Sequence, residues 1–275
     1  MPPATRWRRA RSALLHPQSR AAEPGGSRQS GRLVAAPRLF VDVEFAEQEP
    51  LTLNAERSHY LCRVLRLRAD AAVSVFNGDG SAWSARIEQA DSRSCRLMIY
   101  SRQLAEAAPL CRLHLAQALL KRERQDYVLQ KATELGATDI WLLQTERTEA
   151  RVRPDRMASR LEHWRGVLQS ACEQCGRLRP PALHVPTTLE ELWPGFEDVS
   201  CYILQPGAPI LTGPAAPADT ALIIGPEGGF SELELRIAAA HGAIAAGIGE
   251  LVLRADTAPQ AALTIVRHGW RWAAP

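Results

Sequence analysis

Residues 221–235, with the sequence ALIIGPEGGFSELEL, constrain the fold more than any other stretch of the chain. The apolar run 221–224 is typical of a buried parallel strand, and it stops abruptly at a Gly-Pro pair that is soon followed by a Gly-Gly pair. Glycine is needed in so tight a turn where a side chain would clash or where φ is positive. Ser231 precedes Glu234 by the three residues of a capping box, which predicts the start of a helix. Strand, tight loop and helix in this order often form ligand sites, although an ordinary turn without a ligand has the same spacing.

The chain from residue 109 onward alternates between patterns typical of strands and of helices. Strands are predicted at 112–118, 139–144, 201–204, 221–224 and 243–248. Helices are predicted at 123–135, 156–175 and 232–241, and a last one runs from about 256 to 272. This alternation predicts an α/β domain with a parallel sheet and helices on both of its faces.

Residues 37–106 have the different pattern of a small β-barrel. Short strands are predicted at 38–41, 51–53, 72–76, 83–87 and 95–100, and the sequence Asn-Gly-Asp-Gly at 77–80 is a strong hairpin signal. A short helix is predicted at 58–66. Its arginines, together with Arg68, could face RNA phosphates or could form an ordinary solvated surface. Residues 105–109 are the predicted linker between the two domains.

Two further predicted strands end in loops like the one at 224–230. These loops are 204–207 (Leu-Gln-Pro-Gly) and 248–254 (Ile-Gly-Glu-Leu-Val-Leu-Arg). If the strands are parallel, all three loops lie at the same carboxyl edge and can enclose one pocket. Backbone groups and small apolar side chains in such a pocket suit an adenine ring and a methionine-like chain better than a triphosphate. The chain also lacks the G-x-x-x-x-G-K-[ST] and G-x-G-x-x-G motifs of P-loop and dinucleotide sites.

The charge of the chain is unevenly distributed. Residues 1–36 carry seven arginines and one acidic residue, for a net +6, whereas the rest carries a net −3. The first 36 residues lack apolar periodicity, so we expect a disordered basic extension that could contact RNA phosphates. The folded part is not basic as a whole, so any nucleic-acid surface on it must be a local patch.

The sequence contains no apolar run long enough to span a membrane, and its six cysteines are scattered over a chain of 275 residues. Reduced thiols in a cytoplasmic protein are the default expectation. Cys172 and Cys175 form a C-x-x-C motif, but there is no second pair and no histidine at zinc-finger spacing. Two cysteines on one helix are therefore favoured over a zinc or redox site, and no metal is expected.

Taken together, these motifs resemble the RsmE family of 16S ribosomal RNA uracil-N3 methyltransferases, within the SPOUT superfamily. The resemblance covers residues 37–272. It rests on RVLR at 63–66, QKxxELG at 130–136, Glu-Arg at 146–147, ACEQCGR at 171–177, GPEGG at 225–229, and GxxVLRxxTA at 249–258. Two departures stand out. Ala255-Asp256 replace the usual Thr-Glu pair, and Gln205 replaces a frequent histidine.

This resemblance implies that residues 109–275 form a deep trefoil-knot SPOUT domain that binds S-adenosylmethionine. Residues 37–106 would form a PUA-like RNA-binding barrel, a homodimer would complete the active site, and 16S rRNA or the small ribosomal subunit would be the substrate. A SPOUT methyltransferase that acts on another RNA, or a non-catalytic RNA-binding module with a decayed cofactor site, remains an alternative.

The resemblance also implies the site residues. The expected cofactor contacts are Leu204, Gln205, Pro206, Ile224, Gly225, Pro226, Glu227, Gly228, Gly229, Ile248, Gly249, Leu251, Val252, Leu253, Arg254, Thr257 and Ala258. Uracil N3 must lose a proton, so the site must supply a base or stabilise an anion. The catalytic candidates are Arg254, Glu173 and Arg147, each of which could instead be a cap, a phosphate contact or a salt-bridge partner. The expected RNA contacts are Arg63, Arg66 and Arg177.

Overall fold

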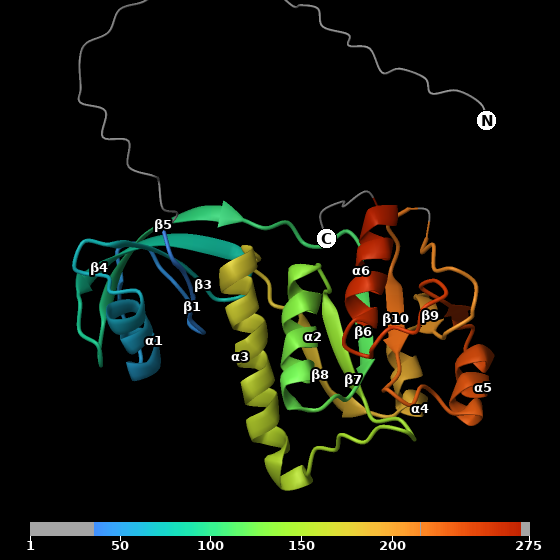
Figure 1. Ribbon diagram of the computed structural model, residues 1–275. Helices are drawn as coiled ribbons and strands as arrows, with labels where there is room; N and C mark the ends of the chain where they lie inside the picture. Colours follow the sequence, from blue (N-terminus) through green and yellow to red (C-terminus); the bar gives the residue numbers. More distant parts are fainter. Residues whose placement is uncertain (1–35, 215, 271–275) are drawn as a thin grey trace, which may run out of the picture. The chain divides into compact units, whose positions relative to one another are not determined.

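The computed structural model describes residues 36–214 and 216–270 (Figure 1). The predicted basic extension, apart from residue 36, and the end of the last predicted helix lie outside the described residues. The first part of the described chain contains β1 (Arg38–Phe40), β2 (Pro50–Thr52), α1 (Ala55–His59), β3 (Ala72–Phe76), β4 (Ser81–Gln89) and β5 (Arg96–Ala105).

The five strands of this first part form one sheet in the order β1-β3-β4-β5-β2. β1 and β3 run parallel and the other neighbours run antiparallel. The predicted hairpin at 77–80 joins β3 to β4. The helix begins three residues earlier than predicted, because the Asn54 side chain caps it by accepting the Arg57 N–H at 2.9 Å. After His59 it continues as a π-helical turn over Tyr60–Val64, which buries Leu61 in the core of this sheet.

The second part of the chain contains six strands. They are β6 (Leu113–Ala118), β7 (Asp139–Leu143), β8 (Ala182–Thr187), β9 (Ser200–Leu204), β10 (Thr220–Ile224) and β11 (Ile244–Ala246). The α-helices are α2 (Arg122–Glu134), α3 (Met157–Cys175), α4 (Leu189–Leu192), α5 (Glu232–Ala240) and α6 (Ala258–Gly269). Short 3-10 turns precede α3 at Pro154–Arg156 and follow α4 at Trp193–Gly195.

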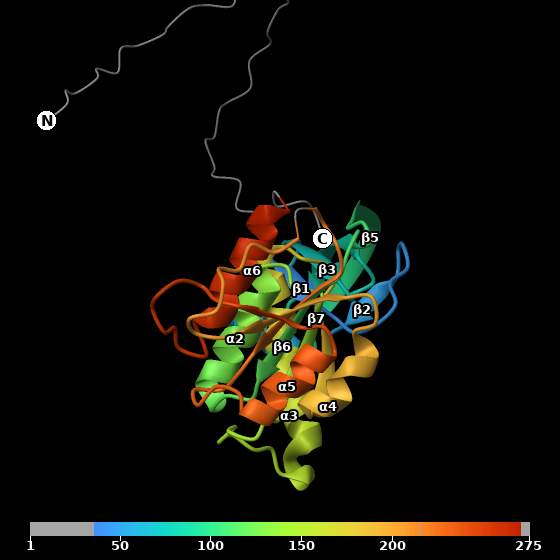
Figure 2. The ribbon, with the colours of Figure 1, turned by 90° about the vertical axis from the view of Figure 1, so that its right-hand side faces the viewer.

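All six strands are parallel, in the order β11-β9-β10-β6-β7-β8. Alternate residues of β10 point to opposite faces, so Leu222 and Ile224 belong to one core and Ala221 and Ile223 to the other. The first core also contains side chains of α2, α3 and α6, and the second contains side chains of α4 and α5 (Figures 1 and 2). The predicted parallel sheet with helices on both faces is therefore confirmed.

The sequence pattern missed β8 and α4. β8 is an edge strand whose residues are half-buried or exposed, and it contains Pro186, so it lacks the apolar run that identifies a buried strand. α4 is a single turn, too short to show helical periodicity, although Thr188 and Glu191 form a complete capping box at its start.

The order of the strands creates a switch point between β6 and β10. From β6 the sheet grows through β7 and β8 on one side, and through β10, β9 and β11 on the other. Ligand sites in open α/β sheets lie at the carboxyl ends of the strands beside such a point.

Candidate cofactor site

A cavity of about 340 Å³ lies at the carboxyl ends of β9, β10 and β11. Three segments surround it, namely 204–206 after β9, 224–229 after β10, and 246–258 from the end of β11 onward, so we call it the three-loop cavity. The parallel sheet brings these segments together, as the sequence predicted. The volume lies within the range of small-molecule sites, which is roughly 300–1,000 Å³.

Most of the expected cofactor contacts line this cavity. Those that do are Leu204, Gln205, Pro206, Ile224, Gly225, Pro226, Glu227, Gly229, Ile248, Gly249, Leu251, Val252, Leu253, Arg254 and Ala258. Gly228 and Thr257 do not line it. Gly228 faces outward against Arg147, since a Cβ built on it would lie 3.3 Å from the Cβ of that arginine. Thr257 is the N-cap residue of α6, and its side chain is exposed.

Glycine geometry shapes the three-loop cavity. Gly229 and Gly249 have φ values of +67° and +114°, which residues with side chains rarely adopt. Gly225 is required for a different reason, because a Cβ there would lie 3.1 Å from the ring of Phe230. These observations explain why the loop after β10 needs at least two of its glycines.

Sequence reasoning missed three lining residues, namely Ala246, Gly247 and Ala255. Gly247 marks a close crossing of two chain segments. Its N–H donates to Pro209 O at 2.7 Å, its carbonyl accepts from Leu211 N–H at 2.8 Å, and a Cβ on it would lie 2.5 Å from Ala208 O. The chain after β11 therefore runs tightly against the chain after β9. Gly247 and Gly249 form a G-x-G sequence that could have signalled this close approach.

The lining of the three-loop cavity fits S-adenosylmethionine. Apolar side chains such as Leu204, Ile224 and Ile248 stand beside the backbone N–H and C=O groups of glycine-rich loops, and the left-handed glycines present the backbone without side chains. An adenine ring needs apolar walls and a few backbone hydrogen bonds, and a sulfonium needs no ion pair in its immediate wall.

Arg124 ties two of these loops together. Its Nη1 lies 2.8 Å from Glu227 Oε1 in the loop after β10, and its Nε lies 3.6 Å from Asp256 Oδ2 in the loop after β11. Arg124 lies near the start of α2, so these ion pairs reach across the switch point. They give a structural role to Glu227, and they show that the shorter carboxylate of Asp256 still reaches a cation.

The three catalytic candidates lie in different parts of the structure. Arg254 lines the three-loop cavity. Arg147 lies outside it and donates from Nη1 to Gly228 O at 2.9 Å, so it supports the outer side of the loop after β10. Glu173 is not a lining residue of this cavity. Its Oε1 accepts from Phe40 N–H and from Arg57 Nη1, both at 2.9 Å, and so it joins α3 to β1 and α1.

The capping box predicted at the start of α5 is present. Ser231 N–H donates to Glu234 Oε2 at 2.7 Å, and Glu234 N–H donates back to Ser231 Oγ at 3.3 Å. The remaining oxygen, Glu234 Oε1, accepts from Glu146 N–H at 2.8 Å. This buried carboxylate therefore joins the loop after β7 to the helix that follows the glycine loop.

Of the three expected RNA contacts, Arg63 and Arg66 are exposed, whereas Arg177 is committed elsewhere. Arg177 Nη1 donates to Thr133 O at 3.1 Å and to Ala137 O at 2.6 Å, at the carboxyl end of α2. A cation here interacts favourably with the carbonyls of the last turn of α2 and of the loop that follows it. The structure thus gives Arg177 a capping role, and its expected RNA contact stays a prediction.

Cys172 and Cys175 lie on α3, the first buried and the second exposed. Burial raises the pKa of the Cys172 thiol to about 12, so it is protonated at neutral pH. Within residues 36–214 and 216–270, no group of three or more His, Cys, Asp or Glu side chains could hold a metal ion. No helix in the same ranges is long and apolar enough to cross a membrane.

A parallel sheet with a glycine-walled cavity at its switch point, preceded by a small β-sheet domain, defines an α/β protein with a site of the size that a small-molecule cofactor needs. A family model described as an RNA methyltransferase domain matches residues 106–267, and one described as an RNA methyltransferase PUA domain matches residues 53–99. A ribosomal RNA small subunit methyltransferase E from Synechocystis is 32% identical over 249 residues, which cover 87% of this chain and 80% of the relative. The chain belongs to this family.

Two solved structures support the same assignment. Lpg2936 of Legionella pneumophila, solved with its bound cofactor SAM, has a TM-score of 0.81 and 34% identity and covers 86% of this chain and 98% of its own. Ribosomal RNA small subunit methyltransferase E from Neisseria gonorrhoeae, bound to S-adenosyl methionine, has a TM-score of 0.78 and 27% identity with the same coverage. The expected fold class is thereby confirmed, and both of these relatives were solved with the cofactor that the resemblance implies.

Proposed function

We propose that this protein methylates N3 of a uridine in the 16S RNA of the small ribosomal subunit, in the cytoplasm. The observation that carries the proposal is the three-loop cavity at the switch point, whose lining suits S-adenosylmethionine and whose rim carries Arg254. The relatives named ribosomal RNA small subunit methyltransferase E supply the class of substrate. The expected cofactor contacts that line this cavity are proposed as the binding residues, except Arg254, which we propose acts on the substrate base.

When bound, S-adenosylmethionine supplies an electrophilic methyl group. The chain's own residues must align the base with that group, exclude water and manage the N3 proton. In this proposal Arg254, which lines the three-loop cavity, stabilises the anion that forms at the uracil ring as N3 loses its proton. Glu227 is held by Arg124 and is therefore a wall residue in this proposal and not the base.

We also propose that the active form is a homodimer. Leu251 and Val252 are 82% and 77% exposed, which is unusual for two neighbouring apolar residues on the rim of a binding cavity. A second copy of the chain would cover them and would close the cavity from the outside. Sedimentation at increasing protein concentration tests this, and a monomer at every concentration would contradict it.

The substrate assignment is tested by mapping 16S RNA from a strain that lacks the gene. We expect one N3-methyluridine to be absent, and to return when purified protein and S-adenosylmethionine are added to the mutant's small subunits. Retention of every N3-methyluridine would contradict the proposal, and loss of a mark in another RNA would favour the other SPOUT activity.

The Arg254→Gln variant tests the proposed role of Arg254 in the same methylation assay. We expect methyl transfer to fall by about 100-fold, while the Kd for S-adenosylmethionine changes much less, because anion stabilisation acts mainly in the transition state. An equal loss in cofactor affinity would show that Arg254 holds the cofactor instead.

A further inference from the structure

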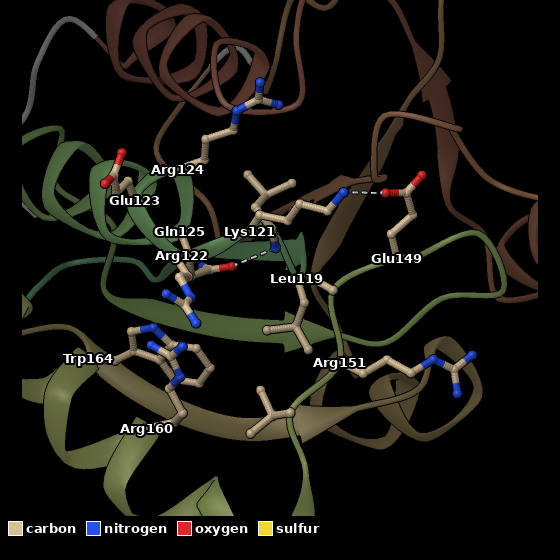
Figure 3. Close-up of a pocket in the computed structure, with 13 residues that line it drawn as sticks. Leu119, Lys121, Arg122, Glu123, Arg124, Gln125, Glu149, Arg151, Arg160 and Trp164 are labelled. Carbon is tan, nitrogen blue, oxygen red and sulfur yellow. Dashed lines mark hydrogen bonds and ion pairs between the residues drawn. The ribbon is translucent and has the colours of Figure 1, made fainter.

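A second cavity, of about 630 Å³, lies at the same edge of the sheet, beyond the carboxyl ends of β6 and β7 (Figure 3). It is bounded by residues 119–125 and 149–152 and by the side chains of Arg160 and Trp164 on α3. We call it the arginine cavity. No feature of the sequence had drawn attention to it, because its basic residues come from three separate segments.

The arginine cavity carries more positive than negative charge. Five basic and two acidic residues line it, namely Lys121, Arg122, Arg124, Arg151, Arg160, Glu123 and Glu149. Lys121 is paired with Glu149, and Arg124 is paired with Glu227 and Asp256. Among the residues that the structure describes, no carboxylate forms an ion pair with Arg122, Arg151 or Arg160. The cavity therefore offers uncompensated positive charge.

Gln125 adds a buried hydrogen-bond donor without a partner. The residue is 1% exposed and lines the arginine cavity. Its Oε1 accepts from Leu120 N–H at 3.0 Å, which fixes the orientation of the amide and is drawn as a dashed line in Figure 3. Its Nε2 has no hydrogen-bond partner among the described residues. An unsatisfied buried donor is costly, so a ligand oxygen is the natural partner of this group.

Arg122 is held in a strained backbone conformation. Its φ is +28°, which is unusual for a residue with a side chain, and it is the first residue of α2. Such strain concentrates at functional positions. Figure 3 shows Arg122 and Arg160 on the Trp164 side of the arginine cavity and Arg124 on the opposite side.

We propose that the arginine cavity binds a phosphate group of the substrate RNA strand. Arg122 and Arg160 would supply the charge and Gln125 Nε2 a neutral hydrogen bond, beside the start of α2, where helix N–H groups favour anions. The inference rests on the proposed function, since it takes RNA as the ligand. Arg124 lines the arginine cavity and pairs with Glu227 of the three-loop cavity, so a strand held here lies next to the methyl-transfer site.

The test measures binding of a labelled single-stranded RNA by fluorescence anisotropy over a salt series, from about 50 to about 200 mM. The variants are Arg122→Gly, which also relieves the backbone strain, Arg160→Gln, the double variant, and Gln125→Glu, which keeps the acceptor for Leu120 N–H. The control is Arg236→Gln on α5, because Arg236 is exposed and lies outside both cavities.

We expect the double variant to bind RNA about tenfold more weakly and to lose about 0.7 from the salt slope for each phosphate contact removed. Gln125→Glu should also weaken binding, whereas Arg236→Gln should not. The Kd for S-adenosylmethionine, measured by calorimetry, should stay at the wild-type value in every variant, which shows that the protein is folded.

Unchanged RNA affinity and salt slope in the double variant would overturn the proposal. Titration with inorganic phosphate tests whether the arginine cavity binds a phosphate of an RNA strand or a free phosphate ion. If phosphate shifts the Gln125 amide resonances while the variants bind RNA normally, the cavity takes a free anion and the RNA proposal fails. If the salt slope falls as expected but no 16S RNA is methylated, the phosphate site stands and only the proposed function fails.

Discussion

Arg124 forms ion pairs with two loops that the sequence analysis treated separately. Its guanidinium pairs with Glu227 from the GPEGG stretch and with Asp256 from the loop after β11. The sequence did not reveal this pairing, because the shared partner lies more than a hundred residues earlier in the chain than either carboxylate. At this scale the side chains on the three-loop cavity hold the loops in place, and the backbone of the glycines forms much of the wall.

Gly229 provides the first test at the residue scale. Both Gly229 and Gly242 have left-handed φ values, +67° and +79°, and a Cβ on either would meet no atom within 4 Å. Replacing either by alanine should therefore cost a similar free energy of unfolding, about 1 kcal/mol.

Of Gly229 and Gly242, only Gly229 lines the three-loop cavity. We expect Gly229→Ala, and more strongly Gly229→Val, to weaken S-adenosylmethionine binding at least about tenfold, since the loop must shift to relieve the strain. Gly242→Ala should bind normally. Calorimetric titration of both proteins checks this, and equal affinities would show that the loop after β10 is only a turn.

At the scale of elements, β6, β7 and β8 are joined at their amino ends by one buried carboxylate. Asp139 on β7 is fully buried and accepts hydrogen bonds from Arg112, Thr138 and His184. The His184 ring also stacks on Trp141 at a centroid distance of 3.5 Å. This network lies at the edge opposite to the two cavities, so it concerns the stability of the sheet.

Burial alone would raise the pKa of Asp139, but hydrogen bonds from His184 and Thr138, the charge of His114 and the Arg112 guanidinium lower it to about 2. The folded state therefore holds this proton less strongly than the unfolded state does. The hydrogen bonds and charges around Asp139 should contribute about 2 kcal/mol to the free energy of unfolding at neutral pH. This contribution should be lost as the pH falls from about 4 through about 2.

Denaturant unfolding as a function of pH checks this, with Asp139→Asn compared with Glu232→Gln, an exposed carboxylate on α5. We expect Asp139→Asn to be less stable than the wild type at pH 7, and to lose less stability than the wild type as the pH falls from about 4 to about 2. Parallel stability curves for Asp139→Asn and the wild type would contradict the assignment.

At the scale of the whole described chain, α3 connects the β-sheet domain to the larger parallel sheet. Trp164 and Leu168 on one face pack in the core against the parallel sheet, while Cys172 packs with Phe40 and Phe76 of the first domain. Glu173 adds the hydrogen bond to Phe40 N–H and the ion pair with Arg57. Glu106, just after β5, also accepts from Leu178 N–H at 2.6 Å.

Glu173 can therefore be tested as a residue that joins domains, against the catalytic role expected from the sequence. Glu173→Ala leaves the buried Phe40 N–H without an acceptor and should lower the free energy of unfolding by about 1–3 kcal/mol. Glu173→Gln keeps an oxygen acceptor and should lower it less. Methyl transfer per folded protein should stay near the wild-type rate in both variants, and a large loss of kcat with unchanged stability would restore the catalytic role.

The sequence alone determined the elements whose signals are local. The GPEGG loop, the capping box at Ser231, the hairpin at 77–80 and the buried strand predicted at 221–224 follow from glycine geometry, capping and apolar periodicity, which act within a few residues. The alternation of strands and helices also predicted that three loops lie at the carboxyl edge of one parallel sheet, and this was enough to predict the three-loop cavity.

Only the tertiary structure decided which distant groups meet. It paired Arg124 with Glu227 and Asp256, assigned Arg177 to the end of α2 and Glu173 to the join between domains, and assembled the arginine cavity from three segments. Ion pairs and buried donors depend on distances that strand order and helix packing set, and a charged side chain looks the same in the sequence whether it meets solvent, a carbonyl or a ligand.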